Sequence, residues 1–143
     1  MASIKRRPDG KWRARYRDAD GREHSRHFSR KIDGQAWLDE VTASVVTGMY
    51  VDPDAGKLTF SVYWQQWSSR QIWARGTKES ADQAAASATF SRRRMNTIKR
   101  GHIESWIKGM TAGERPLAPS TIRTRYNYVS MSFRAAVRDR VIS

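Results

Sequence analysis

The sequence of 143 residues contains no cysteine, which excludes a disulfide framework and any metal site built on thiolates. It has no apolar run of membrane-spanning length, and its N-terminus lacks the apolar segment of a signal peptide. These absences favour a cytosolic protein. Phosphate-binding glycine loops and paired catalytic carboxylates are also missing, so the sequence offers no signature of nucleotide hydrolysis or of acid–base catalysis.

Acidic residues are scarce: 14 Asp and Glu stand against 27 Lys and Arg, which gives a net charge of +13. The excess lies at both ends, with net charges of +7 in residues 1–31, −3 in residues 32–90 and +9 in residues 91–143. Most of the basic residues are arginines, which suit phosphate and guanine contacts. The distribution indicates a polyanion partner, nucleic acid by default, although a charge that only promotes solubility remains the simpler alternative.

The segment GMYVDPDAGKLTF connects an N-terminal part that contains alternating, strand-like apolar residues with a C-terminal part in which apolar residues recur at helical spacing. Gly48 is expected to end a helix, Pro53 and Gly56 break any continuation, and Thr59 is a candidate N-cap for the next helix. We therefore predict a domain boundary, the alternative being an ordinary surface loop within one domain. The predicted organisation is a first domain over residues 1–50, a linker over 51–58 and a second domain over 59–143.

The first domain is predicted to be a three-stranded antiparallel sheet covered by one helix. The strands are expected over residues 3–7, 11–17 and 22–28, separated by the turns Pro8-Asp9-Gly10 and Asp18-Ala19-Asp20-Gly21. Strict alternation in the second strand places Trp12, Ala14 and Tyr16 on one face and Lys11, Arg13, Arg15 and Arg17 on the other. A helix capped by Ser29 and running to about Thr47 would cover the apolar face with Trp37, Leu38, Val41 and Val45. Gly34 is expected to weaken the first turn of this helix, and a start at Asp33 is the alternative.

The second domain is predicted to be all-helical, so the fold class is α+β. Helices are expected over residues 60–71, 78–88 and 100–110, and a long fourth helix begins at Pro119. Thr77 is expected to cap the second helix after a break at Arg75-Gly76. The fourth helix carries Ile122, Tyr126, Val129, Phe133, Ala136 and Val137 on one face.

Three stretches of the chain resemble the N-terminal half of phage-type, lambda-like tyrosine recombinases (integrases). The basic hairpin PDGKWRARYRDADGREHSRHF with its following helix resembles the arm-type DNA-binding domain of that family. The segment GMYVDPDAGKLTFSVYWQQW resembles its junction with the core-binding domain, and LAPSTIRTRYNYVSMSFRAAVRDRVIS resembles the last core-binding helix. The resemblance implies that the second domain is a four-helix, SAM-like core-binding domain.

The resemblance also implies a function, namely sequence-specific binding of arm-type and core-type attachment sites during site-specific recombination and integration of a phage genome. Members of the family continue into a catalytic domain with an Arg-His-Arg set and a nucleophilic Tyr. Because the sequence stops at Ser143, we expect a non-catalytic piece of a tyrosine recombinase. The implied partners are double-stranded DNA, other integrase copies in a synaptic tetramer, a host DNA-bending protein and an excisionase, in the cytoplasm near a bacterial nucleoid. No cofactor is expected.

Candidate DNA-contacting residues lie in both domains. In the first they are Lys5, Arg6, Lys11, Arg13, Arg15, Arg17 and Arg22. In the second they are Lys78, Arg92, Arg93, Arg94, Lys99, Arg100, Arg123, Asn127 and Arg134. Because a two-stranded ribbon fits the major groove, the alternating arginines are the sharpest of these signals. Solvated basic faces are the alternative for each set.

Neither catalysis nor metal binding is predicted from the sequence. Tyr126 is expected to pack on the apolar face and Tyr128 to lie at the surface or against DNA, so neither is predicted to be a nucleophile. His24, His27 and His102 show no metal-ligand spacing. A stand-alone transcription regulator with a basic ribbon and an RNA-binding protein remain the alternative functions.

Overall fold

A computed structural model describes residues 2–143 and shows an α+β protein, as predicted. The chain divides into two compact units, which meet between Asp52 and Pro53. We call the part up to Asp52 unit 1 and the part from Pro53 unit 2. No helix of the described chain is both long and apolar enough to cross a bilayer.

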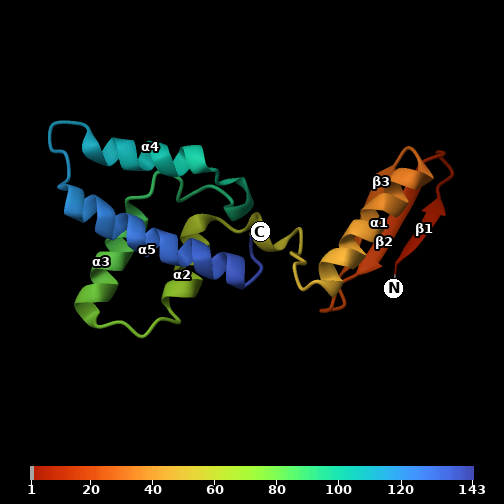
Figure 1. Ribbon diagram of the computed structural model, residues 1–143, viewed down its shortest axis with the longest axis horizontal. Coiled ribbons are helices and arrows are strands. Elements are labelled where there is room, and N and C mark those ends of the chain that lie inside the picture. The colour runs from red at the N-terminus through yellow and green to blue at the C-terminus, as the bar shows by residue number, and fades with distance from the viewer. Residues whose placement is uncertain (1) are drawn as a thin grey trace. The chain divides into compact units, whose positions relative to one another are not determined.

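Unit 1 contains a three-stranded antiparallel sheet in the order β1-β2-β3, with one helix on it (Figure 1). The strands are β1 (Ser3–Arg6), β2 (Trp12–Arg17) and β3 (Glu23–Phe28), and the helix is α1 (Lys31–Val46). Both predicted turns form, with Gly10 and Gly21 at φ of 85° and 82°. Positive φ at these two positions explains why each turn ends in glycine.

The core of unit 1 is small, with Ala14, Tyr16 and Leu38 buried. Partly buried residues from every element complete it: Ile4, Phe28, Trp37, Val41 and Tyr50. Gly34 gives α1 its close approach to the sheet, because a Cβ placed there would lie 2.7 Å from Ile4 Cδ1. Gly34 had been predicted only to weaken the first helical turn, whereas its missing side chain allows the packing.

Two expectations for α1 were wrong. The helix begins at Lys31 with Arg30 as N-cap, not Ser29, and the Arg30–Asp33 ion pair at 3.0 Å ties its first turn. Val45 does not cover the sheet and is 52% exposed. The 16 residues of α1 span roughly 24 Å, whereas six-residue strands span about 20 Å, so the last turn extends beyond the sheet.

Unit 2 contains four α-helices: α2 (Phe60–Ser68), α3 (Arg75–Ala86), α4 (Arg100–Thr111) and α5 (Pro119–Arg138). Two short 3₁₀ helices, η1 (Ala55–Lys57) and η2 (Met95–Thr97), precede α2 and α4. Figure 1 shows α5 running through the middle of the unit, where it packs on the other three helices. Their shared core is aromatic, with Phe60, Trp64, Trp67, Phe90 and Trp106 buried.

Local signals placed most helix starts in unit 2 correctly, whereas α2 ends at Ser68, three residues before its predicted end. The Thr59 hydroxyl accepts the Val62 N–H at the start of α2, and Pro119 opens α5, both as predicted. The start of α3 was predicted wrongly, because the helix begins at Arg75 and includes Gly76. Ion pairs from Arg75 to Glu79 and from Lys78 to Asp82 stabilise these first turns, so no cap by Thr77 is needed.

The segment predicted as a linker is divided between the units. Just before this segment, the hydroxyl oxygens of Tyr50 and Tyr16 lie 2.9 Å apart and share a hydrogen bond within unit 1. Gly56 is buried in unit 2, where a Cβ would lie 2.8 Å from Asn96 Cβ. Residues on both sides of the 52–53 boundary are therefore packed within their own unit, and the independence of the two units stays a prediction.

Candidate nucleic-acid interface

The face of the sheet opposite α1 collects basic residues from all three strands. Antiparallel register places Lys5, Arg13 and His27 in one row across β1, β2 and β3. Arg15 lies opposite Ser25 in the next row toward the β2–β3 turn. Side chains directly opposite in neighbouring strands lie about 5 Å apart, so these groups form a continuous surface.

This face is hollowed by a depression of about 550 Å³, which we call the basic face. It is lined by Lys5, Arg6, Arg7, Pro8, Arg13, Arg15, Ser25 and His27. No carboxylate contributes to this lining among the described residues. The depression therefore combines a concave shape with charge of a single sign, which is how a protein surface attracts an anion.

Few internal contacts compete for these cations. Arg7 Nη1 lies 2.8 Å from Nε2 and 3.1 Å from Nδ1 of the His27 ring. Arg15 Nη1 lies 3.7 Å from Glu23 Oε1 in a half-exposed pair, which is a weak interaction. The buried Nε of Arg13 has no hydrogen-bond partner within residues 2–143. Arg13, at the centre of the sheet, thus retains unused donor capacity.

The remaining predicted residues of unit 1 lie around the basic face. Lys11, which precedes β2, and Arg17, the last residue of β2, are both exposed. Arg17 Nη1 donates to the Gly21 carbonyl oxygen at 3.0 Å, which holds it near the β2–β3 turn. Arg22 precedes β3 and pairs with Asp52 at 3.3 Å, outside the lining of the basic face.

Residues 2–47 match the family model described as phage integrase, N-terminal domain. The matched residues lie within unit 1, so this unit is similar to the N-terminal domain of phage integrases. The match confirms the predicted resemblance to the N-terminal part of a phage-type integrase, and it ends at the C-cap of α1. No curated protein and no solved structure matches the chain.

Unit 1 also contains a polar cluster at its other end, made of Asp18, His24 and Asp52. One ligand-type atom from each lies within 4.8 Å of the others, although the sequence spacing had indicated no metal site. His24 Nε2 lies 2.8 Å from Asp18 Oδ2, and this hydrogen bond holds the pKa of Asp18 below its ordinary value. Asp18 Oδ1 accepts two backbone N–H groups, and Asp52 pairs with Arg22. The cluster is best explained as a satisfied ion-pair network.

In unit 2 the predicted residues fall on several separate surfaces. Arg92, Arg93 and Arg94 are exposed in the connection between α3 and η2. The backbone of this connection is fixed to α2, because Phe60 N–H donates to the Arg93 carbonyl oxygen at 2.9 Å. Lys99 is the N-cap of α4 and Arg100 its first residue, paired with Glu104 at 2.8 Å. Lys78 on α3 is 2.7 Å from Asp82.

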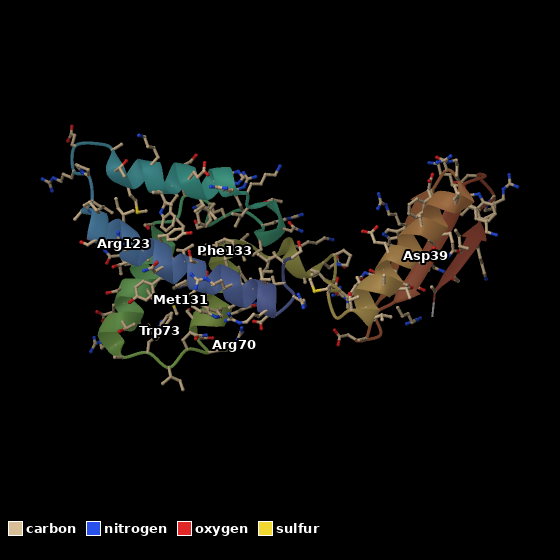
Figure 2. The ribbon with its side chains drawn as sticks, in the orientation of Figure 1. Asp39, Arg70, Trp73, Arg123, Met131 and Phe133 are labelled. Atoms are coloured by element: carbon tan, nitrogen blue, oxygen red, sulfur yellow. The ribbon has the colours of Figure 1, made fainter. Side chains whose placement is uncertain are left out.

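The predicted basic contacts of α5 lie at two separate places along the helix. Arg123 lies near the start of the helix, beside an apolar groove of about 560 Å³ lined by Ile107, Leu117, Ile122 and Tyr126. Arg134 lies 11 residues later, roughly 16 Å along the axis, and lines a different cavity. Asn127 is exposed between them. Figure 2 labels Arg123 near the first turns of α5, away from the labelled Arg70 at the end of α2.

Both tyrosine placements were wrong. Tyr126 is 42% exposed rather than packed in the core, because its side of α5 faces the open groove beside α4. Tyr128 is half-buried and meets Trp73 edge-on at 6.0 Å between ring centroids. This ring packing, and not a surface role, explains Tyr128.

Sequence reasoning missed Arg7 and Ser25 on the basic face and Arg70 in unit 2. It assigned His27 only to the basic hairpin in general, and Arg138 to the exposed polar stripe of the last helix without choosing it as a DNA contact. Alternation along the third strand was the available signal for Ser25 and His27. Phe28 points toward the core, so the side chains of Ser25 and His27 point to the opposite face of the sheet. No local signal points to Arg70, because its neighbours in space lie more than 60 positions further along the chain.

Proposed function

We propose that this chain binds duplex DNA through two surfaces, as the N-terminal part of a phage-type site-specific integrase. Unit 1 binds arm-type attachment sites through the basic face. Unit 2 acts as a four-helix, SAM-like core-binding domain and binds one side of the crossover site. The match of residues 2–47 to the integrase N-terminal domain supports integrase DNA binding in general.

The observation that carries the proposal is the hollow basic face with no carboxylate in its lining. Three strands at about 4.8 Å spacing place the outer strand axes roughly 10 Å apart, comparable with the ~12 Å width of the DNA major groove. Arg13 lies at the centre of this sheet, with Lys5 and His27 on either side. In the groove, Arg13 and Arg15 are placed to read guanine, while the outer cations contact phosphates.

A different observation supports the proposed core-binding role of unit 2. Its exposed cations at Arg92, Arg93, Arg94, Lys99 and Arg100 lie on connections whose backbone is hydrogen-bonded to the helices. Arginines held on a rigid scaffold lose less entropy when they contact phosphates. Core-site recognition by these residues, together with Arg123, Asn127 and Arg134 on α5, is part of the proposal.

The proposal extends to the parent protein. It is a tyrosine recombinase that assembles as a tetramer at synapsis and works with a host DNA-bending protein and an excisionase. Strand transfer belongs to its catalytic domain, so residues 2–143 contribute site recognition. The chain therefore forms no covalent adduct with DNA through Tyr126 or Tyr128.

The test replaces Arg13 or Arg15 by Gln in the full chain and measures affinity for a duplex selected by the wild-type chain. We expect each change to weaken binding by about 1–3 kcal/mol, since each removes a major-groove contact. Arg30→Gln is the matched control, because Arg30 carries the same charge, is 72% exposed and pairs with Asp33 away from the basic face.

Two outcomes would contradict the proposal. Equal effects of Arg13→Gln and Arg30→Gln would mean that only total charge matters. Equal or tighter binding of an RNA duplex would favour an RNA-binding protein, because the narrow major groove of A-form RNA excludes the sheet. Selection from a random duplex pool should return two sequence classes with the wild-type chain and one with the Arg13→Gln/Arg15→Gln chain.

A further inference from the structure

A second concave surface lies in unit 2, between the end of α2 and the last turns of α5. It encloses about 400 Å³ and brings together Arg70, which follows α2, with Arg134 and Arg138 of α5. Figure 2 labels Arg70 and Met131, which contribute to this cavity from the two sides. The fold thus brings Arg70 beside two arginines of α5 that lie more than 60 positions further along the sequence.

The charges of this cavity are unbalanced. Arg134 and Arg138 lie one turn apart on α5, where like charges repel and lower helix stability slightly. The single carboxylate in the lining is Asp139, whose Oδ2 lies 3.6 Å from Arg70 Nη2 with both side chains about half exposed. One exposed carboxylate shared among three arginines leaves a net positive, solvent-accessible site.

A buried hydroxyl close to the cavity also lacks a partner. Tyr63 lies one turn before Trp67, which lines the cavity, and is 2% exposed. Its hydroxyl oxygen has no hydrogen bond within residues 2–143. Burial raises the pKa of Tyr63, Asp139 raises it further, and Arg70 and Arg138 oppose this, so these charged groups lie within electrostatic reach of the hydroxyl.

We propose that the cavity formed by Arg70, Arg134 and Arg138 binds backbone phosphate of duplex DNA. The site deepens the function proposed for unit 2 and rests on it. Guanidinium groups suit this ligand, because their planar donors engage two phosphate oxygens at once. The rise of about 6 Å between Arg134 and Arg138 spreads these donors along the strand. Asp139 pairs weakly with Arg70 and lowers the positive potential of the cavity.

The test is arginine footprinting of the full chain with p-hydroxyphenylglyoxal and mass spectrometry, with and without a 20-base-pair duplex. We expect DNA to lower the modification of Arg70, Arg134 and Arg138 by severalfold. Arg75 serves as the internal control, because it is 94% exposed, lies on α3 and pairs with Glu79 outside the cavity. Inorganic phosphate at the same phosphate concentration should protect much less, and equal protection would overturn the assignment to DNA.

Variants provide an independent measurement. Arg134→Gln and Arg138→Gln should each reduce the slope of log affinity against log salt by about 0.9, the value for one lost phosphate contact, and Arg75→Gln should not. Asp139→Asn should raise affinity at low salt by roughly two- to fivefold, because it removes the opposing charge. A decrease with Asp139→Asn would overturn the proposal, since it would assign the ion pair a purely structural role.

The failures of the two proposals are distinguishable. If DNA protects Arg13 and Arg15 but leaves Arg70, Arg134 and Arg138 reactive, the phosphate site is wrong while DNA binding by unit 1 stands. If DNA protects no arginine and shows no measurable affinity, the proposed function itself is wrong. Melting curves of each variant report whether the fold is intact, so a loss of binding is read only from folded chains.

Discussion

The two units build their cores from unequal material, and this difference explains how their surfaces are organised. Unit 1 buries Ala14, Tyr16 and Leu38 and uses one face of its sheet to do so. Unit 2 buries a much larger cluster dominated by aromatic rings, enclosed by four helices. A sheet with a single covered face leaves its other face whole, whereas a helical bundle leaves only the outer strips of each helix.

The surface charges follow from this geometry. In unit 1 every second residue of β2 points to the open face, so a short alternating sequence yields one concentrated basic surface. In unit 2 the cations predicted to contact DNA lie on α3, on the α3–η2 connection, at the start of α4 and at two places on α5. Unit 1 therefore presents one concentrated basic surface, and unit 2 presents several separate basic patches.

The largest expected effect tests whether the two cores are independent. Trp106→Ala should destabilise unit 2 by about 3–5 kcal/mol, because Trp106 is 1% exposed and meets Phe90 edge-on at 5.7 Å. Urea unfolding of the full chain, followed by separate amide NMR signals of Ala14 and Ala135, measures both units at once. Only the Ala135 transition should move.

The reciprocal variant completes this comparison. Leu38→Ala should lower the Ala14 transition and leave that of Ala135 in place, since Leu38 is buried in unit 1 alone. If either substitution shifts both transitions equally, the chain unfolds as one cooperative domain. The division at residues 52 and 53 would then have no thermodynamic meaning.

Replacing a glycine by alanine should change the free energy of unfolding in opposite directions in the two units. Gly34→Ala should destabilise unit 1 by about 1 kcal/mol, because the new Cβ would lie 2.7 Å from Ile4 Cδ1 and 3.2 Å from Phe28 Cδ2. Gly101→Ala in α4 meets no atom within 4 Å, so it should stabilise unit 2 by about 0.5–1 kcal/mol. Urea denaturation of both variants measures the two signs.

A second substitution identifies the cause. Ile4→Val removes the Cδ1 atom that a Cβ at position 34 would meet, so it should recover part of the stability of Gly34→Ala. Additive effects of Ile4→Val and Gly34→Ala would show that the loss has another origin. Stabilisation by Gly34→Ala alone would mean that helix propensity outweighs packing at this position.

Sequence patterns predicted the elements of unit 1 well, because each depends on local chemistry. Gly10 and Gly21 supply the positive φ of both turns, and the alternation around Ala14 fixes which face α1 covers. The residues that were misjudged depend on distant neighbours. Val45 is exposed because α1 is longer than the strands that it covers. Gly34 is needed because the side chains of Ile4 and Phe28 leave no room for a Cβ at this position.

Unit 2 was predicted at the level of its helices but not of its surfaces. A helical face is broad, so an offset of one residue decides between core and solvent, as Tyr126 and Tyr128 show. The cavity of Arg70, Arg134 and Arg138 depends on how α2 meets α5. Crossings between helices are set by the fit of many side chains, which no short stretch of sequence encodes.

The smallest expected effect concerns the polar cluster of Asp18, His24 and Asp52 in unit 1. Among the described residues, unit 2 contains no comparable cluster of acidic and histidine side chains. Because the His24 hydrogen bond lowers the pKa of Asp18 below the ordinary 3.8, the ionised carboxylate favours the folded state. Its contribution is fully present above that ordinary pKa and is lost as the pH falls through the lower pKa of the folded state. Unit 1 should therefore lose stability below about pH 4 through this group.

Asp18→Asn isolates that contribution, because Asn retains an oxygen for the N–H groups of Asp20 and Arg22 but has no charge to titrate. The stability gap between wild type and variant, taken from the Ala14 transition, should be constant near neutral pH and should close as the pH falls below 4. Asp20→Asn is the matched control, since Asp20 is exposed in the same turn and gives the network only its backbone N–H. A gap that persists at pH 2.5 would mean that Asp18 stabilises the turn by shape alone.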